Sequence, residues 1–410
     1  MIRRFLQPRI LAALADTPIV LLVGARQAGK TTLARALIEE GAHEARYLTL
    51  DAPAVLEAAT GDPAGFVRGL EGPVILDEVQ RAPELFLPIK QAVDSQRVPG
   101  SFLLTGSANV LLQPALSDAL VGRLEALTLW PLAAAEIEGA EANFVDALFA
   151  ASLGGTVAGV PREQVAERLV RGGFPEVLAR PDEDRQDAWL DSYIAALMQR
   201  DIRDLARIEA LRSLPRLLGL LAARSGALLN TASLSRDAGL PQTTLRRYLT
   251  LFEATYLVSP LPSWSANLGK RLVKSPKLYM VDTGVLCHLV GIRAQRLLAD
   301  GNLLGPVLET FVVGELTRQV SWSRTLPRLH HYRTHAGAEV DIILESRDGR
   351  VAAVEVKAAA SVRATDFKSM RFLMEKLDQR FVAGVVLYLG DEVVPFGERL
   401  WALPVAALWS

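Results

Sequence analysis

The sequence predicts an α/β protein of several modules that begins with a parallel sheet covered by helices. The chain has 410 residues, which is too many for one average domain. Half of its residues are hydrophobic and 22% are charged, as in globular proteins and unlike disordered ones. The first third alternates short apolar runs with amphipathic segments, the pattern of strands that each lead into a helix.

Charge and cysteine content exclude several classes of protein. The net charge is −1, so no global field draws the chain onto nucleic acid or a membrane surface. One cysteine, Cys287, excludes a disulfide framework or a cysteine-rich zinc module and suits a reducing compartment. The longest apolar runs are far shorter than the ~20 residues that span a bilayer. Pro8 and Arg9 interrupt the N-terminal segment before an apolar signal core forms. We expect a cytoplasmic protein with no membrane partner.

The first predicted module covers residues 1–160. Its strand candidates are residues 18–23, 46–51, 73–77, 101–105 and 125–129, and helical periodicity is clearest in residues 30–40 and 84–96. In a parallel sheet the carboxyl ends of the strands meet at one edge, where ligands bind in this fold class. Functional side chains are therefore expected just after the strands.

A glycine-rich loop follows the first strand candidate. Residues 24–31, GARQAGKT, match G-x-x-x-x-G-K-[ST] between a strand and a helix. Its glycines let backbone N–H groups turn toward phosphate oxygens, and the helix N-terminus adds its positive dipole end. The lysine supplies a positive charge for the β- and γ-phosphates, and Thr31 is a hydroxyl ligand for Mg²⁺. The predicted nucleotide-binding residues are Gly24, Ala25, Arg26, Gln27, Ala28, Gly29, Lys30, Thr31 and Thr32. A chance glycine-rich turn is the alternative.

Polar residues end the strand candidates that follow. In PVILDE, Asp77 is predicted to hold Mg²⁺ through water, and Glu78 to orient or deprotonate the attacking water. Thr105 and Ser107 in FLLTGSAN are predicted to sense the γ-phosphate. Arg123 is predicted to approach phosphate in its own site or in a neighbour's. The alternatives are solvated acids at a strand end, a polar turn and a surface ion pair.

The order of motifs along the chain resembles the bacterial and archaeal AAA-type ATPases that carry a C-terminal domain of unknown function 4143. The matching motifs are GARQAGKT, LDEVQ, LLTGSAN, GR followed by LWPLAAAE, GGFPEVL, KSPKLYMVDTGVL, HYRTHAGAEVDIIL and VEVK. They span nearly the whole chain. The resemblance implies a P-loop ATPase that uses ATP and Mg²⁺ and releases ADP. Because AAA-type ATPases often form rings, a homo-oligomer is an alternative to a monomer.

The middle of the chain is predicted to be a helical connector, residues 161–224, followed by a winged helix, residues 225–290. Trp189 and Tyr193 are at helical spacing and are expected in the connector's core. In the second module a short helix begins at Ser233, a turn follows, and residues 242–253 form another helix. LVSPL and KLYMVD are predicted to pair as the wing hairpin.

Basic residues gather in this winged-helix candidate. Residues 225–280 contain seven basic side chains and two acidic ones, an excess of +5. Such an excess predicts a face that contacts DNA phosphates. The residues chosen for that contact are Arg246, Arg247, Lys270 and Arg271. A winged helix that packs only against protein is the alternative.

The last predicted module, residues 291–410, is similar to the PD-(D/E)xK core of restriction-endonuclease-like folds. Asp341 in AEVDIIL and Glu355 in VAAVEVK are predicted to hold Mg²⁺, with Glu309 from a helix as a further ligand. Lys357 shares a strand face with Glu355 and would orient water or phosphate. Val340 stands where the pattern has proline. A fold that has lost its cutting activity is the alternative.

Other polar residues near Asp341 are expected to take no part. Glu339 is expected to point to the opposite face of the strand. His330, His331 and His335 are expected to be solvated in a hairpin.

The whole sequence thus predicts Mg²⁺-dependent ATP hydrolysis that moves the winged-helix and nuclease-like modules on DNA. Two alternatives stay open. One is a nucleotide-gated DNA nuclease, and the other is an antitoxin-like switch that binds nucleotide and DNA but hydrolyses little.

Overall fold

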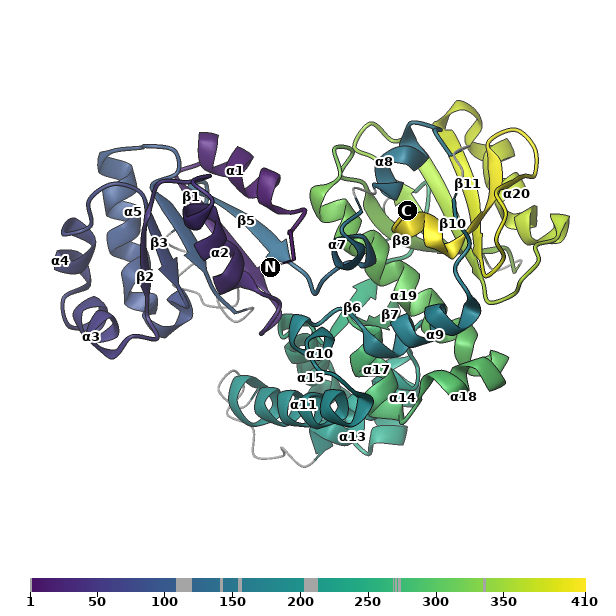
Figure 1. The fold of residues 1–410 in the computed structure, drawn as a ribbon, viewed down its shortest axis with the longest axis horizontal. Coiled ribbons are helices and arrows are strands. Elements are labelled where there is room, and N and C mark those ends of the chain that lie inside the picture. Colours follow the sequence, from purple (N-terminus) through teal and green to yellow (C-terminus); the bar gives the residue numbers. More distant parts are fainter. Residues whose placement is uncertain are drawn as a thin grey trace.

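Figure 1 shows a computed structural model of the chain, in which an α/β lobe stands beside a larger body of helices and a second sheet. The structure describes residues 2–107, 120–140, 143–153, 157–202, 213–267, 269, 271, 274–334 and 337–410. None of the helices in these ranges combines the length and the apolar character that crossing a membrane requires.

The N-terminal lobe is built on a parallel sheet. In the described ranges this sheet has five strands in the order β2-β3-β4-β1-β5, and every pair is parallel. The strands are β1 (Ile19–Gly24), β2 (Arg46–Thr49), β3 (Val74–Asp77), β4 (Phe102–Thr105) and β5 (Leu124–Leu129). β1, β3 and β4 are buried along their whole length, which is why each is a continuous apolar run. The predicted parallel α/β fold is confirmed.

Helices cover both faces of this sheet. α1 (Gln7–Asp16) and α2 (Lys30–Glu39) share one core with Val20 and Leu22 of β1. Leu21 and Val23 face the other core, together with α3 (Pro53–Gly61), α4 (Pro63–Arg68) and α5 (Phe86–Ser95). Alternate residues of β1 therefore serve opposite cores, as the period of a strand requires.

The helical body comes, in chain order, after the strands of the N-terminal sheet and before those of the C-terminal sheet. Its helices are α9 (Arg162–Arg171), α10 (Pro175–Leu178), α11 (Glu183–Ala196), α13 (Leu214–Ala222), α14 (Thr231–Ala238), α15 (Gln242–Ala254), α17 (Thr283–Val290) and α18 (Ala294–Ala299). A π-helical turn, Leu197–Ile202, continues α11. β6 (Val258–Leu261) pairs antiparallel with β7 (Lys277–Met280), so the predicted pairing of LVSPL with KLYMVD is confirmed.

The C-terminal sheet is mixed. Over the described residues it has six strands in the order β12-β13-β11-β10-β9-β8. They are β8 (Arg328–Arg333), β9 (Glu339–Glu345), β10 (Val351–Lys357), β11 (Phe381–Tyr388), β12 (Val394–Pro395) and β13 (Leu400–Pro404). The long helix α19 (Gly301–Trp322) packs on one face, and α20 (Lys368–Leu377) packs on the other. This face-to-face arrangement makes the end module α/β.

Two short helices that follow β5 pack on the C-terminal module. α7 (Ala134–Glu138) and α8 (Phe144–Phe149) share a hydrophobic core with α19, and α8 contacts β11 (Figure 1). The sequence assigned this stretch to the first module, residues 1–160. In space, the N-terminal sheet ends with β5, and the chain crosses to the other body at residues 130–134.

A buried polar joint holds this crossing in place. Arg318 of α19 donates hydrogen bonds to the carbonyl oxygens of Pro131, at 3.0 Å, and Val281, at 3.2 Å. Asp282, which caps α17, accepts a hydrogen bond from the backbone N–H of Gly173 at 2.7 Å. The motifs LWPLAAAE, GGFPEVL and VDTGVL meet at this joint. Their role here is structural, because they bring three separate chain segments together.

Candidate functional site

The glycine-rich loop leaves β1 and turns sharply before α2. Gly24 has φ +151° and Gly29 has φ +98°, conformations that side chains disfavour. A Cβ atom on Gly24 would lie 2.1 Å from the carbonyl oxygen of Leu129 in β5. Since that oxygen belongs to the backbone of a paired strand, it has no room to move aside. The loop therefore needs glycine at its first position for packing as well as for conformation.

Lys30 lies against the loop that it follows. Its Nζ donates to the carbonyl oxygens of Gly24, at 3.1 Å, and Ala25, at 2.9 Å. The side chain is buried. Its ammonium group is thus held inside the curve of the loop, where the phosphates of a bound nucleotide are expected.

Thr31, in the first turn of α2, lies beside Asp77, the last residue of β3, as the sequence predicted for a magnesium site. The Thr31 hydroxyl lies 3.1 and 3.0 Å from the two carboxylate oxygens of Asp77. Tyr47 donates to Asp77 at 2.8 Å, and Thr105 donates to it as well. Burial and the bond to Asp77 raise the pKa of Tyr47 to about 12, so it remains a donor at neutral pH. A hydroxyl beside a carboxylate is an oxygen donor pair that suits Mg²⁺.

Tyr47 was missed by sequence reasoning. It lies on β2, the strand next to β3, and only the strand order of the sheet places it beside Asp77. Thr105, predicted to sense phosphate, donates to the carboxylate of Asp77 and accepts from the backbone N–H of Glu78 at 3.2 Å. These contacts position Thr105 beside the end of β3, and its role as a sensor stays a prediction.

Glu78 stands at the strained end of β3. Its φ of +61° is unusual for a residue with a side chain. The Gln80 side-chain amide donates to its carboxylate, and the backbone N–H of Ser107 donates to the side-chain amide oxygen Oε1 of Gln80 at 3.3 Å. Gln80 thus links Glu78 to Ser107, the second predicted sensor.

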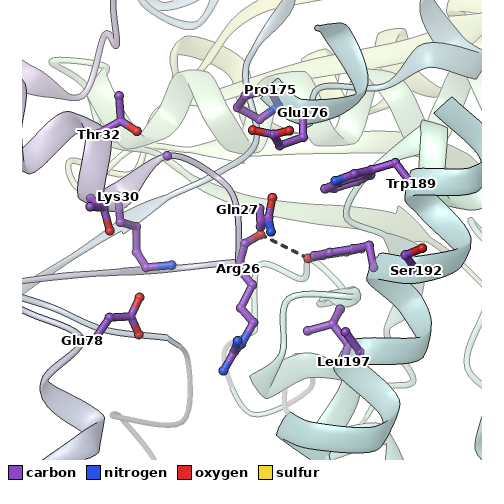
Figure 2. A pocket seen from close by; sticks show the side chains of 14 residues that line it. Arg26, Gln27, Lys30, Thr32, Glu78, Pro175, Glu176, Trp189, Ser192 and Leu197 are labelled. Atoms are coloured by element: carbon purple, nitrogen blue, oxygen red, sulfur yellow. Dashed lines mark hydrogen bonds between the residues drawn. The ribbon is translucent and has the colours of Figure 1, made fainter. Parts of the chain in front are cut away.

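The loop faces a cavity of about 500 Å³ whose opposite wall comes from α10 and α11. Figure 2 shows Lys30 and Glu78 on one side and Trp189 on the other. Tyr193 donates from its hydroxyl to the carbonyl oxygen of Arg26 at 3.3 Å. The ring of Trp189 stacks on that of Tyr193, with centroids 4.9 Å apart and planes 9° apart. The sequence placed these aromatics in a core, and the structure places them also in the wall of the site.

A residue before the first helix supports the loop. Arg4 is buried and donates to the carbonyl oxygens of Ala28 and Trp130, both at 2.7 Å. Its Nε lies 3.0 Å from a carboxylate oxygen of Glu136. No local motif marks Arg4, so the sequence offered no signal for this role.

Arg123 lies at the edge of the sheet opposite the glycine-rich loop, too far away to contact a nucleotide bound in the same chain. It directly precedes β5, whose first residue, Leu124, pairs with Ile19 at the start of β1. The glycine-rich loop follows the other end of β1, so Arg123 and the loop are separated by one strand length, about 20 Å. Arg123 instead forms an ion pair with Asp94, with 2.9 Å between NH2 and Oδ2. A contribution to the site of a neighbouring copy remains a prediction.

The residues predicted to contact DNA do not form one group. Arg246 and Arg247 are exposed on α15. Arg271 is mostly buried by an ion pair with Glu345, with 3.0 Å between NH2 and Oε1, and it lies over the ring of Trp264. Lys270 lies outside the described residues. The excess of +5 therefore overstates the exposed charge, because Arg271 is neutralised within the protein.

The predicted nuclease residues do come together between α19, β9 and β10. Lys357 lies 2.8 Å from Glu355, and Asp341 accepts from the N–H of Val356 at 3.0 Å. Glu309 reaches the same place from α19, but it contacts a further lysine from β7. Among the described residues, no group of three or more His, Cys, Asp or Glu side chains is arranged to hold a metal ion.

Two expectations about the neighbours of Asp341 were wrong. Glu339 lies on the same face of β9 as Asp341, because residues two apart in a strand share a face. His330 and His331 are buried in β8 rather than solvated, and burial lowers the pKa of His331 to about 4. His335 lies outside the described residues.

Three family models match successive parts of the chain. Residues 16–138 match the model of an AAA domain, residues 162–296 match a domain of unknown function 8612, and residues 304–408 match the domain of unknown function 4143. Uncharacterized proteins of Mycobacterium bovis and Mycobacterium tuberculosis are each 34% identical over 98% of this chain and 83% of their own length.

Two solved structures are similar to part of this chain. A Walker-type ATPase of Pyrococcus abyssi is 18% identical and covers 70% of this chain and 96% of its own, with a TM-score of 0.44. The RuvB Holliday junction branch migration motor of Thermotoga maritima is 17% identical and covers 64% and 90%, with a TM-score of 0.31.

Proposed function

This chain belongs to the family of AAA-type ATPases that carry a C-terminal domain of unknown function 4143, and on this basis we propose that it binds ATP with Mg²⁺ and hydrolyses it at the phosphate loop. The observation that carries the proposal is the contact between the Thr31 hydroxyl and the Asp77 carboxylate at 3.0 Å. Thr31 and the buried Lys30 both line the cavity of about 500 Å³.

The binding roles follow from charge and donor type. The Lys30 ammonium compensates the β- and γ-phosphates, in place of its present carbonyl acceptors. Thr31 and Asp77 hold Mg²⁺, which neutralises charge on the phosphates when it is bound. Tyr47 and Thr105 keep the Asp77 carboxylate turned toward Thr31 by donating to it.

Glu78 supplies the base in this proposal. Its carboxylate takes a proton from water while the water oxygen bonds to the γ-phosphorus and the bond from that phosphorus to the bridging oxygen breaks. The products are ADP and inorganic phosphate. Gln80 donates to the Glu78 carboxylate and so holds it at the edge of the cavity.

The aromatic wall is proposed to receive the base of the nucleotide. Trp189 is half-buried and lines the cavity opposite the loop. A purine ring against an indole ring gains stacking energy, about 1–3 kcal/mol per base in other protein complexes. Binding across the cavity would therefore join the N-terminal lobe to α11.

Two variants test the ATPase proposal. We expect Lys30→Ala to lose ATP binding in calorimetry. We expect Glu78→Gln to keep ATP binding and to release phosphate about 100-fold more slowly or worse, since a general base contributes about 10²–10⁴. The matched control is Glu84→Gln, which makes the same change at an exposed acid seven residues after Asp77. This variant should hydrolyse ATP normally. Equal binding by wild type and Lys30→Ala would contradict the proposal.

DNA binding by α15 is a second proposal. It is supported by the exposure of Arg246 and Arg247 on α15, the helix that follows α14 and the turn at Gly239. Changing both arginines to Glu should reduce the slope of log affinity against log salt concentration by about 2, since each phosphate contact contributes ~0.9. The matched control changes two exposed arginines on other helices, Arg162 and Arg185, to Glu. Equal slopes in both variants would favour a module that packs only against protein.

A further inference from the structure

A buried lysine occupies the centre of the nuclease-like acids. The Nζ of Lys277 lies 2.9 Å from Glu309, 3.2 Å from Glu339 and 3.5 Å from Asp341. Only 6% of its side chain is exposed. Lys277 belongs to β7, outside the module that supplies the three acids. An ammonium group has three donors, and here carboxylates from α19 and β9 surround it.

The acids predicted to bind Mg²⁺ already have donors from the protein. One oxygen of Glu309 accepts from Lys277 and also from the Tyr279 hydroxyl at 2.6 Å. One oxygen of Asp341 faces Lys277, and the other accepts from the N–H of Val356 at 3.0 Å. Glu355 is paired with Lys357. A divalent cation does not fit beside an ammonium ion on the same oxygens, because the two positive charges repel each other.

The geometry favours the lysine. Its ammonium group lies within 3.5 Å of carboxylate oxygens from Glu309, Glu339 and Asp341, and 6% of its side chain is exposed. A buried carboxylate needs a cation or hydrogen-bond donors as partners. Lys277 therefore occupies the position between these acids that a divalent ion would take.

Other contacts fasten the same segment to the same sheet. The backbone N–H of Trp264 donates to the carbonyl oxygen of His331 at 2.6 Å, and Nε2 of His331 lies 3.2 Å from the carbonyl oxygen of Ser275. Arg271 pairs with Glu345 at the end of β9. Trp264, Arg271, Ser275 and Lys277 thus each contact β8, β9 or α19, and together these contacts bring Lys277 to the acids.

We propose that Lys277 replaces the divalent metal of the nuclease-like site, so that these acids anchor the β6–β7 ribbon to the C-terminal sheet and do not cut DNA. The predicted Mg²⁺ ligands Glu309 and Asp341 thus serve as a docking site for a lysine of the same chain. The nucleotide-gated nuclease is accordingly disfavoured. This inference does not depend on the ATPase proposal, because it concerns different residues.

Mn²⁺ titration of the full chain tests the proposal. We expect Lys277→Met to bind one more Mn²⁺ ion than wild type in electron paramagnetic resonance titrations. Adding Asp341→Asn to Lys277→Met should remove that ion, whereas Asp341→Asn alone should leave the Mn²⁺ stoichiometry of wild type unchanged. The phosphate loop is the same in all of these proteins, so any ion at Thr31 and Asp77 cancels in the comparison. Loss of Mn²⁺ from wild type on Asp341→Asn, or no additional ion in Lys277→Met, would overturn the proposal.

A thermal melt keeps the test decisive if Lys277→Met folds poorly. Removing Lys277 leaves buried carboxylates without their cation, which is strongly destabilising. We expect Lys277→Met to melt several degrees below wild type and the triple variant Lys277→Met/Glu309→Gln/Asp341→Asn to regain most of that loss. Equal melting temperatures for the single and triple variants would contradict the anchoring role. Cutting of plasmid DNA by wild type with Mn²⁺, abolished by Asp341→Asn, would contradict the absence of nuclease activity.

Discussion

Arg4 and Glu136 form a buried ion pair, 3.0 Å between Nε and Oε1, across 132 positions of the chain. The same arginine holds the carbonyl oxygen of Ala28 in the phosphate loop. Glu136 also accepts from the N–H of Ala133, and the next N–H, that of Ala134, donates to Glu315 of α19 at 3.0 Å. A continuous set of contacts thus runs from the phosphate loop to the helix that carries Glu309.

Removing Arg4 should weaken both the fold and the nucleotide site. Arg4→Ala leaves the buried Glu136 carboxylate without its cation and the carbonyl groups of Ala28 and Trp130 without the donor that Arg4 supplies; breaking a buried ion pair typically costs about 3–5 kcal/mol. We expect a lower free energy of unfolding in urea titrations and a higher Kd for ATP. The exposed neighbour supplies the control: Arg3→Ala should stay within about 0.5 kcal/mol of wild type. If both variants behaved alike, the ion pair would have no special role.

The aromatic wall should discriminate between nucleotides and bare phosphate chains. We expect Trp189→Ala to weaken ATP binding about tenfold, because roughly 1.4 kcal/mol of stacking is lost. Inorganic tripolyphosphate has no base, so its affinity should be unchanged in the same variant. Calorimetry with both ligands makes the comparison. An equal loss for ATP and tripolyphosphate would show that the tryptophan acts through the fold and not through the base.

Arg123 should not affect ATP binding within one chain. Since it lies at the opposite edge of the sheet and pairs with Asp94, Arg123→Ala is expected to change the Kd for ATP by less than about twofold. A role in a neighbouring site has a different signature. The phosphate-release rate per chain would then rise with protein concentration in wild type and stay flat in Arg123→Ala.

Close packing at the polar joint should exclude a side chain at Gly173. A Cβ atom there would lie 2.3 Å from the carbonyl oxygen of Leu132, which is backbone. We expect Gly173→Ala to lower the free energy of unfolding by about 3 kcal/mol or more. Gly219 in α13 has no atom within 4 Å of the equivalent position. Gly219→Ala should therefore stabilise the protein by about 0.5–1 kcal/mol, as expected in a helix.

Buried histidines should make the protein sensitive to mild acid. Burial lowers the pKa of His331 to about 4 from its ordinary 6.5, and it lowers the pKa of His330 as well. Between pH 6.5 and 4 the unfolded chain binds a proton at His331 that the folded chain does not, so stability falls as the pH falls. The slope is at most about 1.4 kcal/mol per pH unit for one histidine. Urea titrations at pH 7.5 and 5.0 should show a smaller loss for His331→Gln than for wild type. A larger loss in the variant would contradict this assignment.

Local signals in the sequence predicted the parallel sheet and the phosphate loop. Continuous apolar runs, the strand-loop-helix context of Gly24 to Thr31, and the acids at the end of β3 are contained in short segments. Such segments carry their own conformational preferences, so one sequence suffices to recognise them. The pairing of β6 with β7 followed in the same way from two apolar runs after a helix-turn-helix pattern.

Tertiary structure alone decided which distant polar groups contact each other. Arg4 reaches Ala28, Tyr47 reaches Asp77, Arg271 reaches Glu345 and Lys277 reaches Glu309, each across at least twenty-four positions of the chain. No short pattern specifies such a contact, because it depends on strand order and on how the modules pack. The sequence by itself thus determined the phosphate-binding loop and the kind of sheet that holds it. Packing of distant segments decided that Arg123 stands away from the loop and that a lysine, rather than a divalent ion, balances the acids of the end module.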